Sequence, residues 1–222
     1  MPGMRRYVVY RIKSKDSKDT ASRRDFNEGS NDIIVTPDWL ARKIWKIALT
    51  HWRISTNIWN EDTKPHSILD PCCGDGVLFK YIPTWKNTIY AYDILPIEGK
   101  LPHITYKQCN FLTEPYDAKY NFSIILMNPP FSEKNPTGGT TKFVERCLER
   151  MGDKSVLVTI VPTYFVDNSE RRKEWLSTLI EKRMVLPKHT FATKVSDKPQ
   201  PLHSELLVIK KNCSNKFFLF KD

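Results

Sequence analysis

The chain has 222 residues, of which 40% are hydrophobic and 12% aromatic, so it can bury one core and is not globally disordered. No run of about 18 apolar residues is present, and the sequence therefore predicts no membrane-spanning helix. The basic start of the chain, Met1 to Arg6, is not followed by the apolar stretch of a secretory signal. We therefore expect a cytoplasmic protein.

Positive charge is concentrated at the two ends of the chain. The net charge is +10, with 8 basic and 4 acidic residues in 1–30, 15 and 14 in 31–164, and 12 and 7 in 165–222. This distribution suits a polyanion, because neutralised phosphates release counterions and drive binding. Nucleic acid is the expected partner, and an ordinary solvated basic surface is the alternative.

The cysteines do not form a recognisable site. None belongs to a C-x-x-C pair, and no histidine cluster has the spacing of a zinc site. An odd count without a secretory signal favours reduced thiols that pack as small hydrophobic side chains. The sequence predicts no metal site; the five cysteines are Cys72, Cys73, Cys109, Cys147 and Cys213.

The composition of the chain changes near residue 33. Residues 4–12 favour a short strand, and the polar, charged stretch 13–32 favours a flexible linker. We therefore expect a basic, partly flexible segment at 1–32 and a single catalytic domain at 33–222.

Strands and helices alternate along the second segment. Thr36-Pro37 opens a helix, because proline suits the first helical turn and apolar residues then recur at helical spacing, and residues 169–182 also favour a helix. Alternation of this kind predicts an α/β fold with a doubly wound, mostly parallel sheet. The six expected strands are 67–70, 88–93, 104–108, 122–127, 155–161 and 205–210.

Polar residues follow the carboxyl ends of these strands, where such sheets bind their ligands. Gly74 and Gly76 come directly after the strand that ends at Asp70 and allow a tight turn with close approach of a ligand. A dinucleotide fingerprint would need a small residue at position 79, which is Phe79. The acids Asp70 and Asp75 favour a cationic ligand, and the ammonium and sulfonium of S-adenosylmethionine fit them.

The strand 88–93 also ends in an acid. Asp93 is placed to accept hydrogen bonds from both ribose hydroxyls of such a cofactor, and Ile94 could cover one face of its adenine. A helix N-cap is the alternative role for Asp93.

The strand 122–127 runs directly into Asn128-Pro129-Pro130-Phe131. Two successive prolines fix the backbone rigidly and leave its carbonyls free to accept. Acceptors at the Asn128 side chain and the Pro129 carbonyl could hold the two hydrogens of an exocyclic amine and direct its lone pair at a methyl group. Phe131 could stack on the base, worth about 1–3 kcal/mol. Residues 132–139 favour a mobile loop that closes over substrate.

These motifs resemble the amino-group DNA methyltransferases, specifically the N6-adenine enzymes in which the cofactor motifs precede the catalytic one. The similarity covers about residues 33–211: 70–76 is similar to the glycine motif, Asp93 to the ribose acid and 128–131 to the catalytic tetrad. The resemblance implies a seven-stranded class I methyltransferase sheet, S-adenosylmethionine as cofactor and methyl transfer to adenine N6.

Further segments carry weaker parts of the resemblance. Thr36-Pro37 looks like the upstream cofactor motif, whose threonine helps hold the methionine end. Residues 161–165 (VPTYF), followed by Arg171-Arg172, resemble the segment that shapes the target-base pocket. The cofactor site implied by the family comprises Thr36, Pro37, Asp70, Cys72, Gly74, Gly76, Asp93, Ile94, Asn110, Phe111 and Asn128.

The chain also departs from the family. Asn110-Phe111 stands where an acid usually binds the adenine of the cofactor, and Cys72-Cys73 is bulkier than the usual residues of the glycine motif. We expect no separate target-recognition domain, so a partner protein or the basic ends would supply recognition. Structured RNA is the alternative substrate, and a catalytically silent partner subunit is a further alternative. Phe131 and the basic ends disfavour the related protein glutamine methyltransferases.

Overall fold

The computed structural model describes residues 9–11, 34–60, 65, 67–83, 87–96, 103–115, 121–131, 139–188, 190–193, 196–199 and 203–211. The strands of its main sheet are β1 (Val9–Arg11), β3 (Ser67–Asp70), β4 (Thr88–Asp93), β5 (Ile104–Gln108), β6 (Phe122–Met127), β7 (Met151–Pro162), β8 (Ile180–Val185) and β11 (Ser204–Lys210). The helices are α1 (Asp38–Thr56), α2 (Thr140–Glu149) and α3 (Glu170–Ser177), and Val77–Phe79 forms the 3-10 turn η1.

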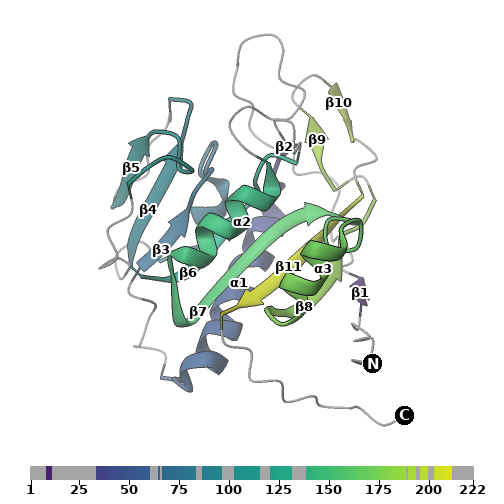
Figure 1. Cartoon of the computed structure of the whole chain (residues 1–222). Coiled ribbons are helices and arrows are strands. Elements are labelled where there is room, and N and C mark those ends of the chain that lie inside the picture. Colours follow the sequence, from purple (N-terminus) through teal and green to yellow (C-terminus); the bar gives the residue numbers. More distant parts are fainter. Residues whose placement is uncertain are drawn as a thin grey trace.

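The main sheet has eight strands in the order β1-β8-β11-β7-β6-β3-β4-β5 (Figure 1). Only β11 runs antiparallel to its neighbours, so the expected mostly parallel sheet is confirmed. The sheet has one strand more than the expected seven, because β1 pairs in parallel with the outer side of β8.

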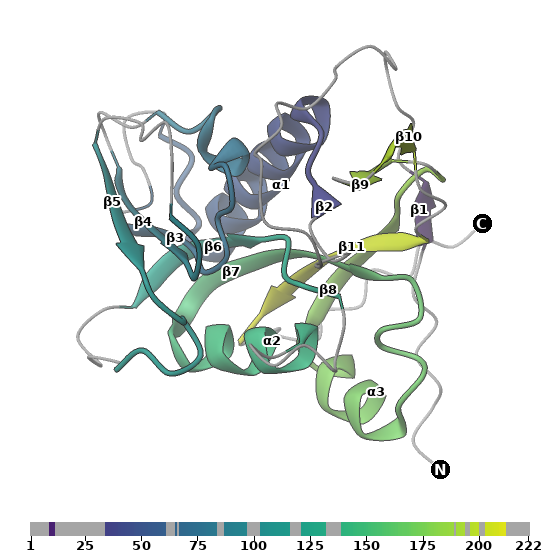
Figure 2. The same ribbon diagram turned by 90° about the horizontal axis from the view of Figure 1, so that it is seen from above.

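Helices cover both faces of this sheet, as the strand-helix alternation predicts. Figure 2 shows α1 on one side and α2 and α3 on the other. Alternate residues of β7 belong to the hydrophobic cores on the two faces of the sheet. Val156 and Val158 pack in the core on the α1 side, whereas Leu157 packs in the core on the α2 side. A strand covered on both faces has to be apolar on both, which explains its nearly continuous hydrophobic run.

All six expected strands are confirmed, but the helix expected at 169–182 is wrong in its second half. α3 ends at Ser177, and β8 begins at Ile180. β8 pairs with β11 on one side and β1 on the other, and its Ile180 and Met184 are buried. Tertiary pairing therefore overrides a weak local helical pattern.

A second, three-stranded sheet joins distant parts of the chain. It consists of β2 (Ile34–Val35), β9 (Ala192–Thr193) and β10 (Ser196–Pro199), in the order β10-β9-β2. Figure 1 shows these strands grouped at the top of the view. Phe191, which is fully buried, anchors the start of β9 in the core beneath α1.

The linker expected at 13–32 and residues 132–138 of the expected mobile loop lie outside the described residues. Within the described part of the chain, no helix is long and apolar enough to cross a membrane.

Phe191→Ala should lower the free energy of unfolding by about 3–5 kcal/mol, because it opens a cavity in a packed core. Urea denaturation monitored by circular dichroism measures the change. Tyr164→Ala is the control, since Tyr164 is 69% exposed and its removal leaves no cavity. Equal stabilities of the two variants would contradict the anchoring role of Phe191.

Candidate functional site

The predicted site residues meet at one edge of the main sheet. β6, β3, β4 and β5 are parallel neighbours, so their carboxyl ends lie together. Leu69 pairs with Ile125, which brings Asp70 and Asn128 to the ends of adjacent strands. The strand order reverses between β3 and β6, and this is where doubly wound sheets bind ligands.

The glycine turn after β3 is tied to the end of β4. The Gly74 N–H donates to Asp93 Oδ2 at 2.7 Å, and the Cys73 N–H donates to the Tyr92 carbonyl at 2.9 Å. Gly74 and Gly76 have φ of +52° and +75°, values that glycine adopts without strain. Apart from the two chain neighbours of Gly74, no atom of the described residues lies within 4 Å of where a Gly74 side chain would begin, so there is open space next to the turn.

Asp70 is a buried carboxylate, only 1% exposed. Its Oδ1 accepts the Cys72 N–H at 3.1 Å, while Oδ2 has no hydrogen-bond partner among the described residues. Burial raises the pKa of Asp70 well above its ordinary value, and the charges of Asp93 and Asp75 raise it further. A cation next to Oδ2 would relieve both effects.

Asp93 lies at the carboxyl edge of the sheet and also accepts hydrogen bonds from the backbone around it. Besides Gly74, its carboxylate accepts the Leu95 N–H at 3.0 Å through Oδ1. A carboxylate oxygen has more than one acceptor site, so these bonds leave capacity for ligand hydroxyls. Ile94, beside it, is exposed at the same edge.

Asn110 and Phe111, the two site residues predicted after β5, have different surroundings. Asn110 caps its own turn, its Oδ1 accepting the Leu112 N–H at 3.0 Å. Phe111 is a core residue: its ring stacks on Phe143 and lies 4.2 Å from the Arg150 guanidinium carbon. The expected contact of the Phe111 ring with a cofactor therefore does not fit this structure, because the ring points into the core that packs on α2.

Asn128 is hydrogen-bonded to the segment before α1. Its Nδ2 donates to Thr36 Oγ1 at 3.0 Å. Thr36 is buried, and the next residue, Pro37, caps α1 by accepting the N–H groups of Leu40 and Ala41 through its carbonyl. The structure thus joins two predicted site residues that are 92 positions apart.

The rest of the tetrad is fixed to both neighbouring layers. Thr140, fully buried at the start of α2, donates its hydroxyl to the Pro130 carbonyl at 2.9 Å. Pro129 is buried, and Phe131 is partly buried against the core on the α1 side. The backbone that carries Asn128 is therefore held rigidly at the edge.

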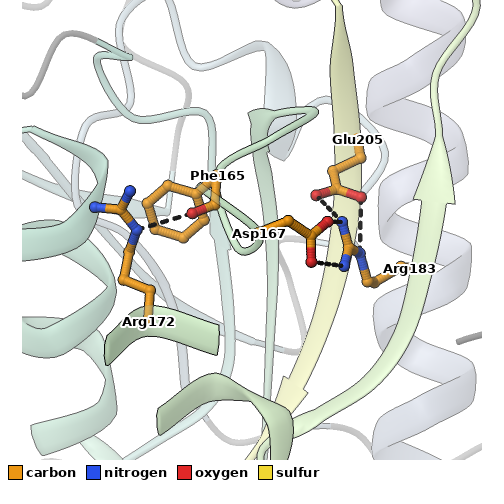
Figure 3. A network of polar contacts seen from close by, with 5 residues as sticks. All are labelled: Phe165, Asp167, Arg172, Arg183 and Glu205. Atoms are coloured by element: carbon orange, nitrogen blue, oxygen red, sulfur yellow. Dashed lines mark hydrogen bonds and ion pairs between the residues drawn. The ribbon is translucent and has the colours of Figure 1, made fainter. Parts of the chain in front are cut away.

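The segment after β7, which resembles a target-base segment, exposes Tyr164 beside the buried Phe165. Arg172 of α3 donates its Nε to the Phe165 carbonyl at 2.8 Å, and its guanidinium carbon lies 5.0 Å from the Phe165 ring centre (Figure 3). Arg172 therefore holds this segment in place. The exposed Arg171 makes no comparable contact among the described residues.

An ion network, buried at Arg183 and Glu205 and exposed at Asp167, holds the same segment from the other side. Figure 3 shows Arg183 of β8 between Asp167 and Glu205. Its guanidinium donates to Asp167 at 2.8 and 3.2 Å and to Glu205 at 2.9 Å through both Nε and Nη2. Burial raises the pKa of Glu205, whereas the Arg183 hydrogen bonds lower the pKa of Asp167.

Several of these contacts were not predicted from the motifs. Thr140 has no signal in the sequence, because its role depends on the packing of α2. Glu205, an acid within an apolar strand, is a sequence signal for a buried ion pair. Tyr106 of β5 places its hydroxyl 3.7 Å from where a Gly76 side chain would begin, and strand alternation could have suggested this.

The described cysteines form no disulfide with one another, and Cys73 and Cys147 are buried among apolar side chains. Burial raises the pKa of Cys72 well above its ordinary value, so its thiol stays protonated. In the described residues, no group of three or more His, Cys, Asp or Glu side chains could hold a metal ion.

No protein-family model matches the chain, and no curated protein matches it. Solved structures do. The methyltransferase subunit of a type I restriction-modification system from Streptococcus thermophilus aligns with a TM-score of 0.62 at 15% identity, over 82% of this chain and 46% of that one. A Vibrio vulnificus YJ016 protein described as the modification subunit of a type I restriction enzyme has a TM-score of 0.59 at 16% identity, over 82% and 45%.

A third structure is a Listeria monocytogenes protein described as a class I S-adenosylmethionine-dependent methyltransferase. It aligns with a TM-score of 0.58 at 14% identity, over 82% of this chain and 62% of that one. The fold is that of class I methyltransferases. The chain spans less than two thirds of each of these proteins, and at such identities the likeness establishes the methyltransferase fold alone.

Asp70→Asn should stabilise the protein at pH 7. The native pKa of Asp70 is raised above the ordinary value of 3.8, so the native state holds its proton more tightly than the unfolded chain does. Stability therefore falls as the pH rises above about 3.8, and asparagine removes this loss. Urea denaturation from pH 4 to pH 8 should show the gain growing with pH. Asp153→Asn is the control, since Asp153 is exposed near the start of β7. A destabilised Asp70→Asn at pH 7 would contradict the assignment.

Arg183→Met should destabilise the protein by about 3–5 kcal/mol, because it leaves the Glu205 carboxylate buried without its partner. The double variant Arg183→Met, Glu205→Met should recover most of this loss, since no charge then remains buried. Thermal unfolding of both variants measures the difference. A double variant as unstable as the single one would show that packing, and not the charge, dominates at this site.

Proposed function

We propose that this chain transfers a methyl group from S-adenosylmethionine to the N6 amine of adenine in DNA. The observation that carries the proposal is the placement of Asn128 on a rigid backbone at the end of β6, beside the acid-lined glycine turn at the end of β3. The strand order reverses between these two strands, so the two motifs face one ligand-binding edge.

The residues of the glycine turn fit this cofactor. Asp70 Oδ2 is buried without a partner among the described residues, and the ammonium of the methionine end would supply one. Asp93 has acceptor capacity for the ribose hydroxyls, and the open space beside Gly74 admits a ligand close to the backbone. Asp70 and Asp75 at the turn and Asp93 at the end of β4 disfavour a pyrophosphate, because like charges repel.

The tetrad suits transfer to a planar amine. S-adenosylmethionine supplies a methyl group on a sulfonium that leaves as a neutral thioether. The Asn128 carbonyl end and the Pro129 carbonyl would accept the two N6 hydrogens, favouring a pyramidal nitrogen whose lone pair faces the methyl carbon. After attack, the extra proton on the nitrogen passes to solvent.

The exposed Tyr164 is the side chain we assign to the target base on the other wall of the site. The segment that carries it is fixed by Arg172 and by the Arg183 network, so its ring is presented on a rigid support. Stacking of a base on such a ring is worth about 1–3 kcal/mol. A base in duplex DNA must leave the stack to reach it, at a cost of a few kcal/mol.

One observation favours DNA as the polymer. Two of the similar structures carry the names of type I restriction-modification methyltransferase subunits. The net charge of +10, with the excess at the ends of the chain, suits the phosphate backbone of either nucleic acid. The names of these subunits also motivate a protein partner that supplies target recognition.

The test offers tritiated-methyl S-adenosylmethionine with duplex DNA, single-stranded DNA and total RNA, followed by nucleoside analysis. Label in N6-methyladenine of DNA supports the proposal. Label in RNA would show that RNA, and not DNA, is the substrate. No incorporation into any polymer would contradict the proposal and favour a catalytically silent or cofactor-binding subunit.

Asn128→Ala should lower kcat by a factor of about 100–1,000, because it removes one of two acceptors that act on the amine in the transition state. Cofactor affinity, measured by calorimetry, should change little. Asn121→Ala is a matched control, since Asn121 is exposed just before the amino end of the same strand. Retained turnover in Asn128→Ala would remove Asn128 from the reaction.

A further inference from the structure

Thr36 and Asn128 form a side-chain pair that the sequence alone does not predict. The resemblance assigns Thr36 to the methionine end of the cofactor and Asn128 to the amine. In the structure, Thr36 Oγ1 lies 3.0 Å from Asn128 Nδ2, and Thr36 is only 4% exposed. The hydroxyl therefore contacts the catalytic amide directly.

Thr36 is fixed in position from both sides along the chain. Immediately before it, Val35 pairs with Ala192 in the small sheet. Immediately after it, the Pro37 carbonyl accepts the first N–H groups of α1 at 3.0 and 3.1 Å. A hydroxyl held between a strand and a helix N-terminus cannot follow Asn128 if the amide rotates, so it constrains that rotation.

The constraint matters because the two ends of an amide have opposite hydrogen-bonding character. The NH₂ end only donates, and the carbonyl end only accepts. An amine substrate needs the carbonyl acceptor. A flipped Asn128 would instead turn its NH₂ group toward the N–H groups of the amine, and no hydrogen bond could form. Holding the NH₂ end at Thr36 turns the carbonyl end the other way.

We propose that Thr36 is a positioning residue that fixes the Asn128 amide with its carbonyl toward the substrate amine. This role rests on the proposed methyl transfer, and it differs from the cofactor contact that the resemblance implies. Thr36 then contributes to kcat through Asn128, and cofactor affinity is largely independent of it.

The test compares Thr36→Val, which has nearly the same shape without the hydroxyl, with Thr36→Ser, which keeps the hydroxyl. Thr36→Val should lower kcat about tenfold at saturating cofactor and DNA, as expected for one lost hydrogen bond that orients a reacting group. The dissociation constant for S-adenosylmethionine and the KM for DNA should stay within about twofold. Thr36→Ser should restore most of kcat.

Thr56→Val is the matched control, because the Thr56 hydroxyl donates to the Trp52 carbonyl at the far end of α1. Its activity should equal that of the wild type. An unchanged kcat in Thr36→Val would overturn the proposal. So would a weaker cofactor affinity with kcat unchanged at saturation, since that pattern identifies Thr36 as a cofactor ligand.

A second measurement does not depend on activity. The side-chain amide signal of Asn128 in heteronuclear NMR is identified by its loss in Asn128→Ala. It should shift and broaden in Thr36→Val and keep its position in Thr36→Ser and Thr56→Val. An unmoved signal in Thr36→Val overturns the positioning role, whereas a wild type that transfers no methyl to any polymer overturns the proposed function and leaves this readout to decide the contact.

Discussion

A carboxylate withheld from water at the end of β3 is the constraint on which the site depends. Asp70 gives one oxygen to the Cys72 N–H and keeps the other without a partner among the described residues. Burial and the neighbouring acids both disfavour its charge. A fold selected for stability alone would replace such a group, and in the proposed function the cofactor's ammonium would supply the missing partner.

The backbone around this carboxylate is held by polar contacts from outside its own strand. Asp93 fixes the glycine turn through the Gly74 N–H, Thr140 fixes the tetrad through the Pro130 carbonyl, and Thr36 fixes Asn128. These contacts join residues that are 19, 10 and 92 positions apart in the sequence. Rigid placement of acceptors before substrate arrives is what electrostatic catalysis requires, because no reorganisation energy is then spent during the reaction.

The elements that could be predicted from the sequence are those whose local pattern agrees with their position in the fold. The six strands were predictable because buried strands must be apolar and because their polar ends mark one edge of the sheet. β8 was not, since Lys182 and Arg183 interrupt its apolar pattern and its strand character comes from pairing with β11 and β1. β1 lies within the short strand expected at 4–12, but its parallel pairing with β8 could not be predicted from the local pattern.

Within the site, the sequence predicted which residues follow each strand, but it did not predict which way their side chains point. Asn110 and Phe111 follow β5 as expected, yet the Phe111 ring turns into the core, where Arg150 and Phe143 contact it. Neighbouring residues in a loop can point to opposite layers, and only packing decides which does so. For Asp93 the position agrees with the prediction. It ends β4 as expected, and its carboxylate points to the glycine turn, where it accepts the Gly74 N–H.

The small sheet joins Asn128 to a part of the chain that the motifs do not include. β9 follows Phe191, which is buried in the core that packs on α1, and pairs with β2, which leads directly into Thr36. Thr36 in turn accepts a hydrogen bond from the Asn128 amide, so the surroundings of that amide depend on the pairing of β2 with β9. This dependence has no signal in the sequence, because it arises from two short strands that come from distant parts of the chain.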